Sequence, residues 1–171
     1  MSTIYTIGHS TRTIEQFIAM LQAHHVQELV DVRTVPRSRH NPQFGMDELA
    51  VSLEQAGIEY AHLSALGGLR HAHKDSINSG WRNDSFRGYA DYMGTQAFQD
   101  ALDELQRQAL QRTVAIMCAE AVPWRCHRSL IADALTVQGW QVLHITSDKA
   151  ANLHKLTPFL NVQGGTLTYP E

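Results

Sequence analysis

The chain alternates between short apolar runs and longer amphipathic stretches. The apolar runs are rich in β-branched and aliphatic residues and predict five strands, at 4–7, 26–32, 58–63, 113–117 and 140–145. The stretch from Ile14 to Leu21 has its apolar residues at helical spacing, and Thr13 with Gln16 has the spacing of a capping box. Strands separated by helices favour right-handed βαβ crossovers and a parallel sheet.

We therefore expect one α/β domain over residues 1–171, a three-layer sandwich with a mainly parallel sheet of about five strands and helices on both faces. Two segments lack a clear period. One is a long loop at about 64–88, and loops of this length in compact domains are usually functional or mobile. The other is a short C-terminal extension at about 147–171, with a predicted hairpin around Gly164 and Gly165.

Local signals also predict several helix ends. Asp47 is expected to cap a helix that stops at Gly57, and Thr95 is expected to cap a later one. Gly139 is expected to end the helix that follows Pro123. In the C-terminal extension we expect a helical stretch from about Ser147.

The composition is that of an ordinary globular protein, with 43% hydrophobic and 18% charged residues in a chain of 171. A net charge of −3 argues against binding nucleic acid by bulk charge, so any anion recognition must be local. We see neither a secretory signal nor an apolar stretch of about 18 residues, and we expect a cytoplasmic protein that does not contact membranes. In such a compartment the only two cysteines favour free thiols, a metal site or catalysis over a disulfide.

Polar side chains collect where each predicted strand ends. They are His9, Ser10, Asp31, Arg33, His62, Cys118, Glu120 and His144, with Gly8 next to the first of them. For any one of them the simplest interpretation is that polar residues return at strand ends. Ligands of open α/β sheets bind outside the carboxyl ends of the strands, however, so the set as a whole predicts a site at this edge.

The most informative segment runs from Met117 to Arg128. A buried strand ends on Cys118, a loop follows, and a helix begins with Cys126, His127 and Arg128 in or near its first turn. A helix N-terminus and nearby arginines can bring a cysteine pKa from ~8.5 to ~3.5–7.5, which makes a nucleophile at neutral pH. The loop resembles those of phosphatases and sulfurtransferases, but no arginine stands at the spacing from Cys118 that those loops require.

We expect a small enzyme that acts on a phosphate-bearing or otherwise anionic ligand, such as a nucleotide or nucleic acid, by thiol-based chemistry. The catalytic candidates are Cys118, Glu120, His9 and His127. The candidates for ligand binding are Gly8, Ser10, Asp31, Arg33, Arg37, His62, Cys126 and Arg128. The sequence indicates no particular cofactor or oligomeric state.

Three alternatives stay open. The first is a non-catalytic module that binds a nucleotide or a nucleic-acid end. The second is a metal site for zinc or iron, with ligands drawn from Cys118, Cys126, His127, Glu120, His9 and His144, although the spacing of the two cysteines and His127 matches no compact zinc pattern. The third is a structural cluster in which Asp31 pairs with Arg128, Glu120 pairs with Arg33, and the cysteines pack as small hydrophobes.

Several motifs together resemble a known family. They are Tyr5–Ser10, Asp31–Arg33 followed by Pro36 and Ser38, Leu66–Gly68, Tyr89–Met93, and Met117–Glu120 with Cys126–Arg128. In combination they are similar to the bacterial and archaeal family called domain of unknown function 488, over nearly the whole chain. The resemblance implies a small cytosolic α/β fold but no activity. It maps recurring motif positions onto residues that the strand-end argument also selects, Cys118 and Arg33 among them.

Overall fold

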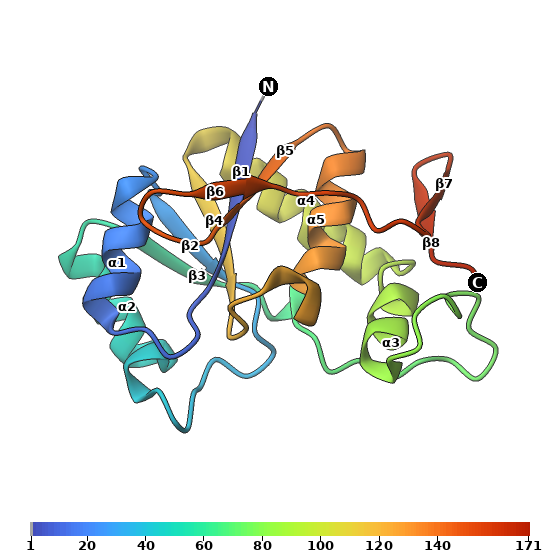
Figure 1. Ribbon diagram of the computed structural model, residues 1–171, viewed down its shortest axis with the longest axis horizontal. Helices are drawn as coiled ribbons and strands as arrows, with labels where there is room; N and C mark the ends of the chain where they lie inside the picture. Colours follow the sequence, from blue (N-terminus) through green and yellow to red (C-terminus); the bar gives the residue numbers. More distant parts are fainter. Residues whose placement is uncertain (1) are drawn as a thin grey trace.

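The structure is a computed structural model that describes residues 2–171. Its larger sheet consists of β1 (Thr3–Gly8), β2 (Glu28–Asp31), β3 (Glu59–His62), β4 (Val114–Cys118), β5 (Gln141–Ile145) and β6 (Ala151–Leu153). The strand order is β3-β2-β4-β1-β5-β6 (Figure 1). The first five strands pair in parallel and β6 pairs antiparallel with β5, so the predicted α/β class and mainly parallel sheet are confirmed.

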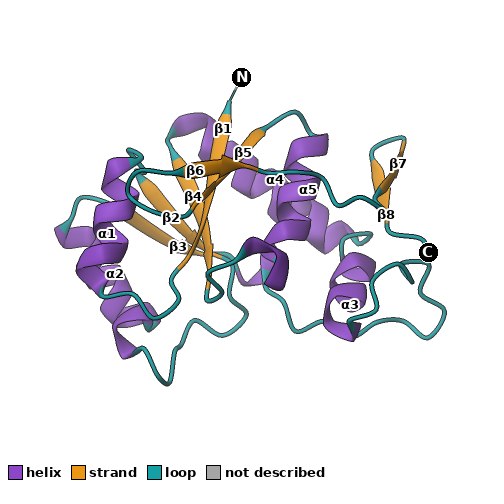
Figure 2. Ribbon diagram, viewed as in Figure 1, coloured by secondary structure: helices purple, strands orange, loops and turns teal. Residues whose placement is uncertain are grey.

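Helices connect the parallel strands. They are α1 (Ile14–Ala23), α2 (Met46–Gln55), α3 (Asp84–Tyr92), α4 (Gln96–Gln111) and α5 (Arg128–Val137), with short 3-10 turns η1 (Pro42–Phe44), η2 (Ser64–Leu66) and η3 (Pro123–Arg125). In Figure 2, α1 and α2 lie on one side of the sheet and α4 and α5 on the other. No helix among residues 2–171 has the length and apolar character needed to cross a membrane.

The two faces of the sheet bury separate apolar cores. Along β4 the side chains alternate, so that Ile116 packs with Leu102 of α4 and Leu130 of α5, whereas Met117 packs with Phe17 of α1. Every residue of β2 and β4 is buried, because helices cover both faces. This explains why β4 reads as a continuous apolar run in the sequence.

Most predicted helix ends are observed. Thr13 forms the expected capping box with Gln16, and Thr95 caps α4 by accepting the Phe98 N–H. Gly57 and Gly139 follow α2 and α5 with positive φ angles of 77° and 100°, which favour glycine.

The cap predicted at Asp47 is wrong by two positions. Helix α2 begins at Met46, its N-cap is Gly45, and Asp47 lies within the first turn. The Gly45 N–H is bonded to the Pro42 carbonyl of η1, so the preceding turn determines where the helix begins.

The C-terminal extension differs partly from its prediction. The helical stretch expected from Ser147 is wrong, because Ser147 lies in a turn whose far side forms β6 and pairs with β5. The predicted hairpin is present as β7 (Asn161–Gln163) and β8 (Thr166–Thr168), joined by Gly164 and Gly165.

Candidate functional site

A cavity of about 630 Å³ opens beyond the carboxyl ends of β2 and β4. In Figure 1 β1 runs downward from the N-terminus, so this edge of the parallel sheet lies at the bottom of the view. Six predicted site residues line the cavity: Arg33, Arg37, Cys118, Glu120, Cys126 and His127. The other predicted residues lie behind or beside this lining and support it.

The long loop and α3 supply a wall that the strand-end argument did not include. Gly68 and Leu69 come from the loop, and Asn83, Phe86 and Tyr89 come from the start and middle of α3. The Tyr89 ring lies 4.9 Å from the His127 ring. The predicted loop at 64–88 therefore contributes directly to the cavity.

Gly8 and Ser10 shape the loop after β4. The Ser10 N–H donates to the Ala119 carbonyl, and the His9 N–H donates to the Cys118 carbonyl. A Cβ atom on Gly8 would lie only 1.7 Å from the Glu120 carbonyl oxygen, so a side chain cannot fit there. These residues thus position the loop that carries Cys118 and Glu120.

Cys118 ends β4 with its side chain 2% exposed. Its Sγ lies 3.6 Å from the Glu120 carbonyl oxygen. Burial raises the pKa of this thiol, but a hydrogen bond from Cys126, the positive charge of Arg128 and a backbone hydrogen bond at Glu120 outweigh burial, so the pKa is lowered overall. The surroundings favour a thiolate at Cys118.

Cys126 lies just before α5 and interacts with the two residues that follow it. Its Sγ accepts the Arg128 backbone N–H at 3.4 Å and lies 3.5 Å from His127 Nδ1. The hydrogen bond with Cys118, and then burial, raise the pKa of Cys126 well above its ordinary value. In this pair the lower pKa belongs to Cys118.

His127 is held in one orientation. Its Nε2 lies 3.0 Å from the Val32 carbonyl, which can only accept, so Nε2 carries the proton. Burial lowers the pKa of His127 to about 4, so the ring is neutral near pH 7. Its unprotonated Nδ1 therefore faces the Cys126 thiol as a hydrogen-bond acceptor.

Arg128 projects from the first turn of α5 beneath the cavity and is 1% exposed. Its Nη1 donates to Thr6 Oγ1 at 3.1 Å, and its Nη2 donates to the carbonyls of Glu120 and Ala121. Its Nε has no hydrogen-bond partner within residues 2–171. The predicted pairing of Arg128 with Asp31 is wrong, because Arg128 is bound by neutral oxygens.

Asp31 pairs with Arg33 instead. Arg33 Nε and Nη2 donate to the two carboxylate oxygens, the shortest contact being 2.7 Å, and the Tyr60 hydroxyl donates to the same carboxylate at 2.6 Å. Burial and this carboxylate raise the pKa of Tyr60. The predicted pairing of Glu120 with Arg33 is therefore wrong as well, and the Arg33 guanidinium is already neutralised where it reaches the cavity.

His9 and His62 both contact Arg33. His9 is 2% exposed and stacks on Phe44 with 4.4 Å between ring centroids, and its Nε2 lies 3.5 Å from Arg33 Nη1. Burial lowers the pKa of His9. His62 Nε2 donates to the Arg33 carbonyl at 2.6 Å. Neither ring lines the cavity.

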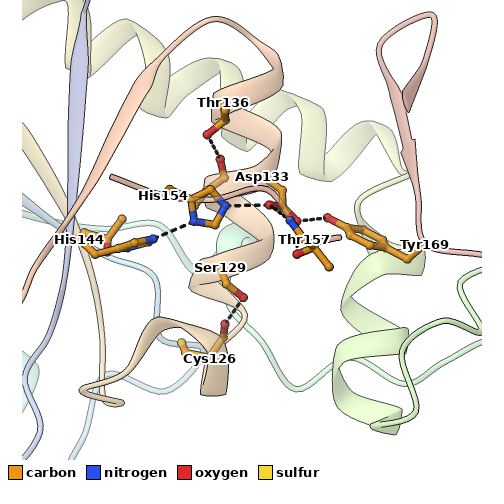
Figure 3. Close-up of polar contacts among 10 residues, drawn as sticks. Cys126, Ser129, Asp133, Thr136, His144, His154, Thr157 and Tyr169 are labelled. Atoms are coloured by element: carbon orange, nitrogen blue, oxygen red, sulfur yellow. Dashed lines mark hydrogen bonds and ion pairs between the residues drawn. The ribbon is translucent and has the colours of Figure 1, made fainter. Parts of the chain in front are cut away.

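His144 of β5 lies in a separate polar chain, most of which is drawn in Figure 3. Its Nε2 lies 2.8 Å from His154 Nδ1, and His154 Nε2 lies 2.7 Å from Asp133 Oδ1. At the other end, Thr6 Oγ1 lies 2.5 Å from His144 Nδ1 and accepts from Arg128. Because a carboxylate only accepts, all these protons point toward Asp133, and the chain links Arg128 to that carboxylate.

Burial lowers the pKa of His144 to about 3, which keeps its ring neutral within this chain. His144 and His154 also line a second, more apolar cavity of about 470 Å³ between Trp124 and Phe159. The sequence analysis selected His144 but missed Asp133 and His154. A signal for Asp133 was present, since it is the only charged residue between Leu130 and Leu135, in the most apolar part of its helix.

No cluster of three or more histidine, cysteine or acidic side chains within residues 2–171 is arranged to hold a metal ion. Cys118 and Cys126 are both free thiols. Two thiols and one imidazole do lie together, but the Nε2 of that imidazole is engaged with the Val32 carbonyl and its Nδ1 lies 3.5 Å from Cys126 Sγ.

Comparisons with known proteins give one match. Neither the curated proteins nor the solved structures contain a match to this chain. Residues 13–135 match the family described as Domain of unknown function DUF488, and this region includes most of the cavity lining, from Arg33 to His127. Because the match covers well over half of the chain, the protein belongs to the DUF488 family.

Proposed function

We propose that the protein is an enzyme that binds a small anionic ligand, such as a phosphate-bearing molecule, in the cavity and attacks it with the Cys118 thiolate. One observation carries this proposal: the cavity brings a thiol with a lowered pKa together with exposed arginines. A nucleophile and a set of anion-binding groups in one cavity are the minimum for covalent catalysis on an anion.

Arg37 and Arg125 would bind the anion. Both are exposed, both line the cavity, and neither forms a salt bridge with any residue of the described chain. Arg33 is already engaged with Asp31, and Arg128 lies below the cavity surface. A guanidinium can grip phosphate or carboxylate with two parallel hydrogen bonds.

Cys118 would form the covalent bond, and Glu120 would move a proton. Glu120 is exposed in the same lining, two residues after Cys118. Acid–base assistance of this kind typically contributes about 10²–10⁴-fold to a rate. The free thiols and the absence of bulk positive charge fit a cytoplasmic enzyme with a small-molecule substrate.

Alkylation of the wild-type protein by matched reagents tests both parts of the proposal. Iodoacetate is anionic and iodoacetamide is neutral, and mass spectrometry of peptides reports modification at Cys118 separately from Cys126. We expect alkylation of Cys118 to titrate below the pKa of an ordinary thiol. We also expect replacement of Arg37 and Arg125 by alanine to slow iodoacetate about ten-fold at low salt and to leave iodoacetamide nearly unchanged.

Arg39→Ala is the matched control, because Arg39 is an exposed arginine near Arg37 that does not line the cavity. An equal loss of iodoacetate reactivity in Arg39→Ala would show a general charge effect and contradict the anion site. An ordinary thiol pKa at Cys118 would contradict the nucleophile.

A non-catalytic binding module is the second candidate, and the slight exposure of Cys118, 2%, favours it. In that case Cys118→Ala would still bind an anion such as inorganic pyrophosphate, while the double replacement of Arg37 and Arg125 would not. Calorimetric titration with pyrophosphate would measure both.

A further inference from the structure

The two cysteines of the chain lie together although seven residues separate them. Cys118 ends β4, Cys126 precedes α5, and both side chains belong to the same buried cluster, where each shifts the pKa of the other. Both line the same cavity, and both are free. Buried cysteines usually serve as small apolar side chains, but two that lie close together beside an open cavity can also exchange electrons.

The pair is chemically asymmetric. Arg128 lies beneath it, no carboxylate among residues 2–171 is bonded to its guanidinium, and the Asp133 carboxylate is separated from Arg128 by three side chains. A buried guanidinium favours a nearby anion, and the Cys118 thiolate can supply one. Cys126 instead faces the unprotonated Nδ1 of His127 at 3.5 Å, so its proton has an acceptor.

We propose that this protein exchanges thiols for disulfides with a small anionic disulfide, Cys118 attacking first and Cys126 resolving the mixed disulfide. The proposal rests on the proposed function for its cavity and nucleophile, and it names the class of substrate. Arg37 and Arg125 at the cavity would hold the carboxylates of that substrate.

The steps balance without a further oxidant. The Cys118 thiolate attacks one sulfur of the substrate RSSR, which forms a Cys118–SR bond and releases RS⁻. Once Cys118 is part of a disulfide it no longer raises the pKa of Cys126, which loses its proton to solvent and attacks Cys118 Sγ. This attack forms the Cys118–Cys126 disulfide and releases the second RS⁻. Both thiolates leave as RSH after protonation by solvent. The protein is oxidised and the substrate reduced by two electrons, and an external dithiol reverses the reaction.

The loop between the cysteines is the part of the chain that must adjust. A disulfide brings two sulfurs to about 2.05 Å, closer than any hydrogen bond between thiols. The loop contains η3 and the exposed Trp124. Its first part is held in place, because Ala119 accepts from the Ser10 N–H and Arg128 donates to the carbonyls of Glu120 and Ala121. The backbone hydrogen bonds of Val122 to Arg125 stay within the loop and Cys126, so this outer part can shift together with Cys126.

The test uses the folded wild-type protein and 5,5′-dithiobis(2-nitrobenzoate), a disulfide with one carboxylate on each half. We expect two equivalents of thionitrobenzoate to be released per chain, and the product to have lost the mass of two hydrogen atoms with no adduct. Dithiothreitol should restore the original mass. A stable product carrying one or two thionitrobenzoate groups would overturn the proposal, and this measurement needs no variant.

Two variants assign the order of attack. Cys126→Ser should release one equivalent and hold the adduct on Cys118, whereas Cys118→Ser should react at least ten-fold more slowly. Fast labelling of Cys126 in Cys118→Ser would contradict the order proposed.

The neutral bis(2-hydroxyethyl) disulfide separates the two proposals. In one outcome, the protein reacts faster with 5,5′-dithiobis(2-nitrobenzoate) than with the neutral disulfide, this preference depends on Arg37 and Arg125, and no internal disulfide forms. The proposed function then stands and the exchange activity does not. If an internal disulfide forms without any charge preference, the cysteine pair stands and the anionic cavity does not.

Discussion

Arg33 and Arg128 are both buried at the edge of the site, and the chain stabilises them in different ways. Arg33 has a carboxylate, since Asp31 accepts from its Nε and Nη2. Arg128 donates only to a hydroxyl and two carbonyls, which do not neutralise its positive charge. This charge therefore acts on the nearby Cys118 thiol. We infer that Arg33 holds the strand ends together, whereas Arg128 sets the electrostatic potential at Cys118.

His127 leads to a prediction about pH. Its pKa is about 4 in the folded protein and 6.5 when exposed, so between these values the unfolded state binds more protons. The stability that His127 contributes is complete above pH 6.5 and is lost as the pH falls toward 4. We expect His127→Gln to flatten the fall in the free energy of unfolding over this range by up to about 1.4 kcal/mol per pH unit. Urea unfolding at pH 5 and pH 7 measures it.

His71→Gln is the control for that experiment, because His71 is an exposed histidine of the long loop. It should leave the pH dependence unchanged. If His127→Gln and the wild type lose stability in parallel between pH 7 and pH 5, the neutral buried ring is not the cause.

The sequence predicted where the site residues lie better than it predicted their partners. Cys118, Glu120 and Arg37 do line one cavity, because the direction of the parallel strands decides which edge they reach. The pairing of Asp31 with Arg33 was missed, although residues two apart at a strand end share one face. Arg128 could not be assigned, because its acceptors include main-chain carbonyls that only the folded loop brings near.

At the scale of single elements, the start of α1 gives a clear prediction. Thr13 accepts the Gln16 N–H at 3.1 Å, and the Gln16 side chain accepts the Thr13 N–H at 3.0 Å. We expect Thr13→Ala to lower the free energy of unfolding by about 1 kcal/mol, because a helix N–H loses its acceptor. Thr11→Ala is the control, since Thr11 is exposed and has no side-chain hydrogen bond among the described residues. Equal losses in denaturant unfolding would contradict the capping role.

Elements were predictable where local chemistry determines them. The capping box at Thr13 and the positive φ at Gly57 and Gly139 depend on nearby residues only. The stretch from Ser147 failed because its structure depends on pairing with β5, in which Ala151 lies opposite Ile145. Helix propensity is a weak guide when strand pairing competes with it.

Across the whole molecule, buried polar residues attach the C-terminal segment to the rest of the fold. Asn78 of the long loop accepts the Tyr169 N–H at 2.8 Å and donates to Asp91 of α3 at 2.7 Å. Asp133 of α5 accepts from the Tyr169 hydroxyl at 2.8 Å. These contacts join residues far apart in sequence, which is why no local pattern indicated them. They connect α3, which forms one wall of the cavity, to the C-terminal segment.

Asp133 therefore gives a prediction about the stability of that segment. Its two oxygens accept from His154, from the Thr157 N–H and hydroxyl, and from Tyr169, and the side chain is fully buried. Asparagine has one acceptor oxygen and would place an N–H₂ against some of these donors. We expect Asp133→Asn to lower the free energy of unfolding by about 2–4 kcal/mol and to loosen the segment first.

Limited trypsin digestion shows which part of the chain opens in Asp133→Asn. Lys155 is exposed within the anchored segment, whereas Lys149 lies in the turn before β6, outside the contacts of Asp133. Cleavage after Lys155 should accelerate more than cleavage after Lys149, and Asp148→Asn, a change in an exposed turn, should alter neither. Equal acceleration at both lysines would mean that Asp133 stabilises the whole fold. Unchanged cleavage at Lys155 would mean that the hydrogen bonds of Asp133 do not hold the segment.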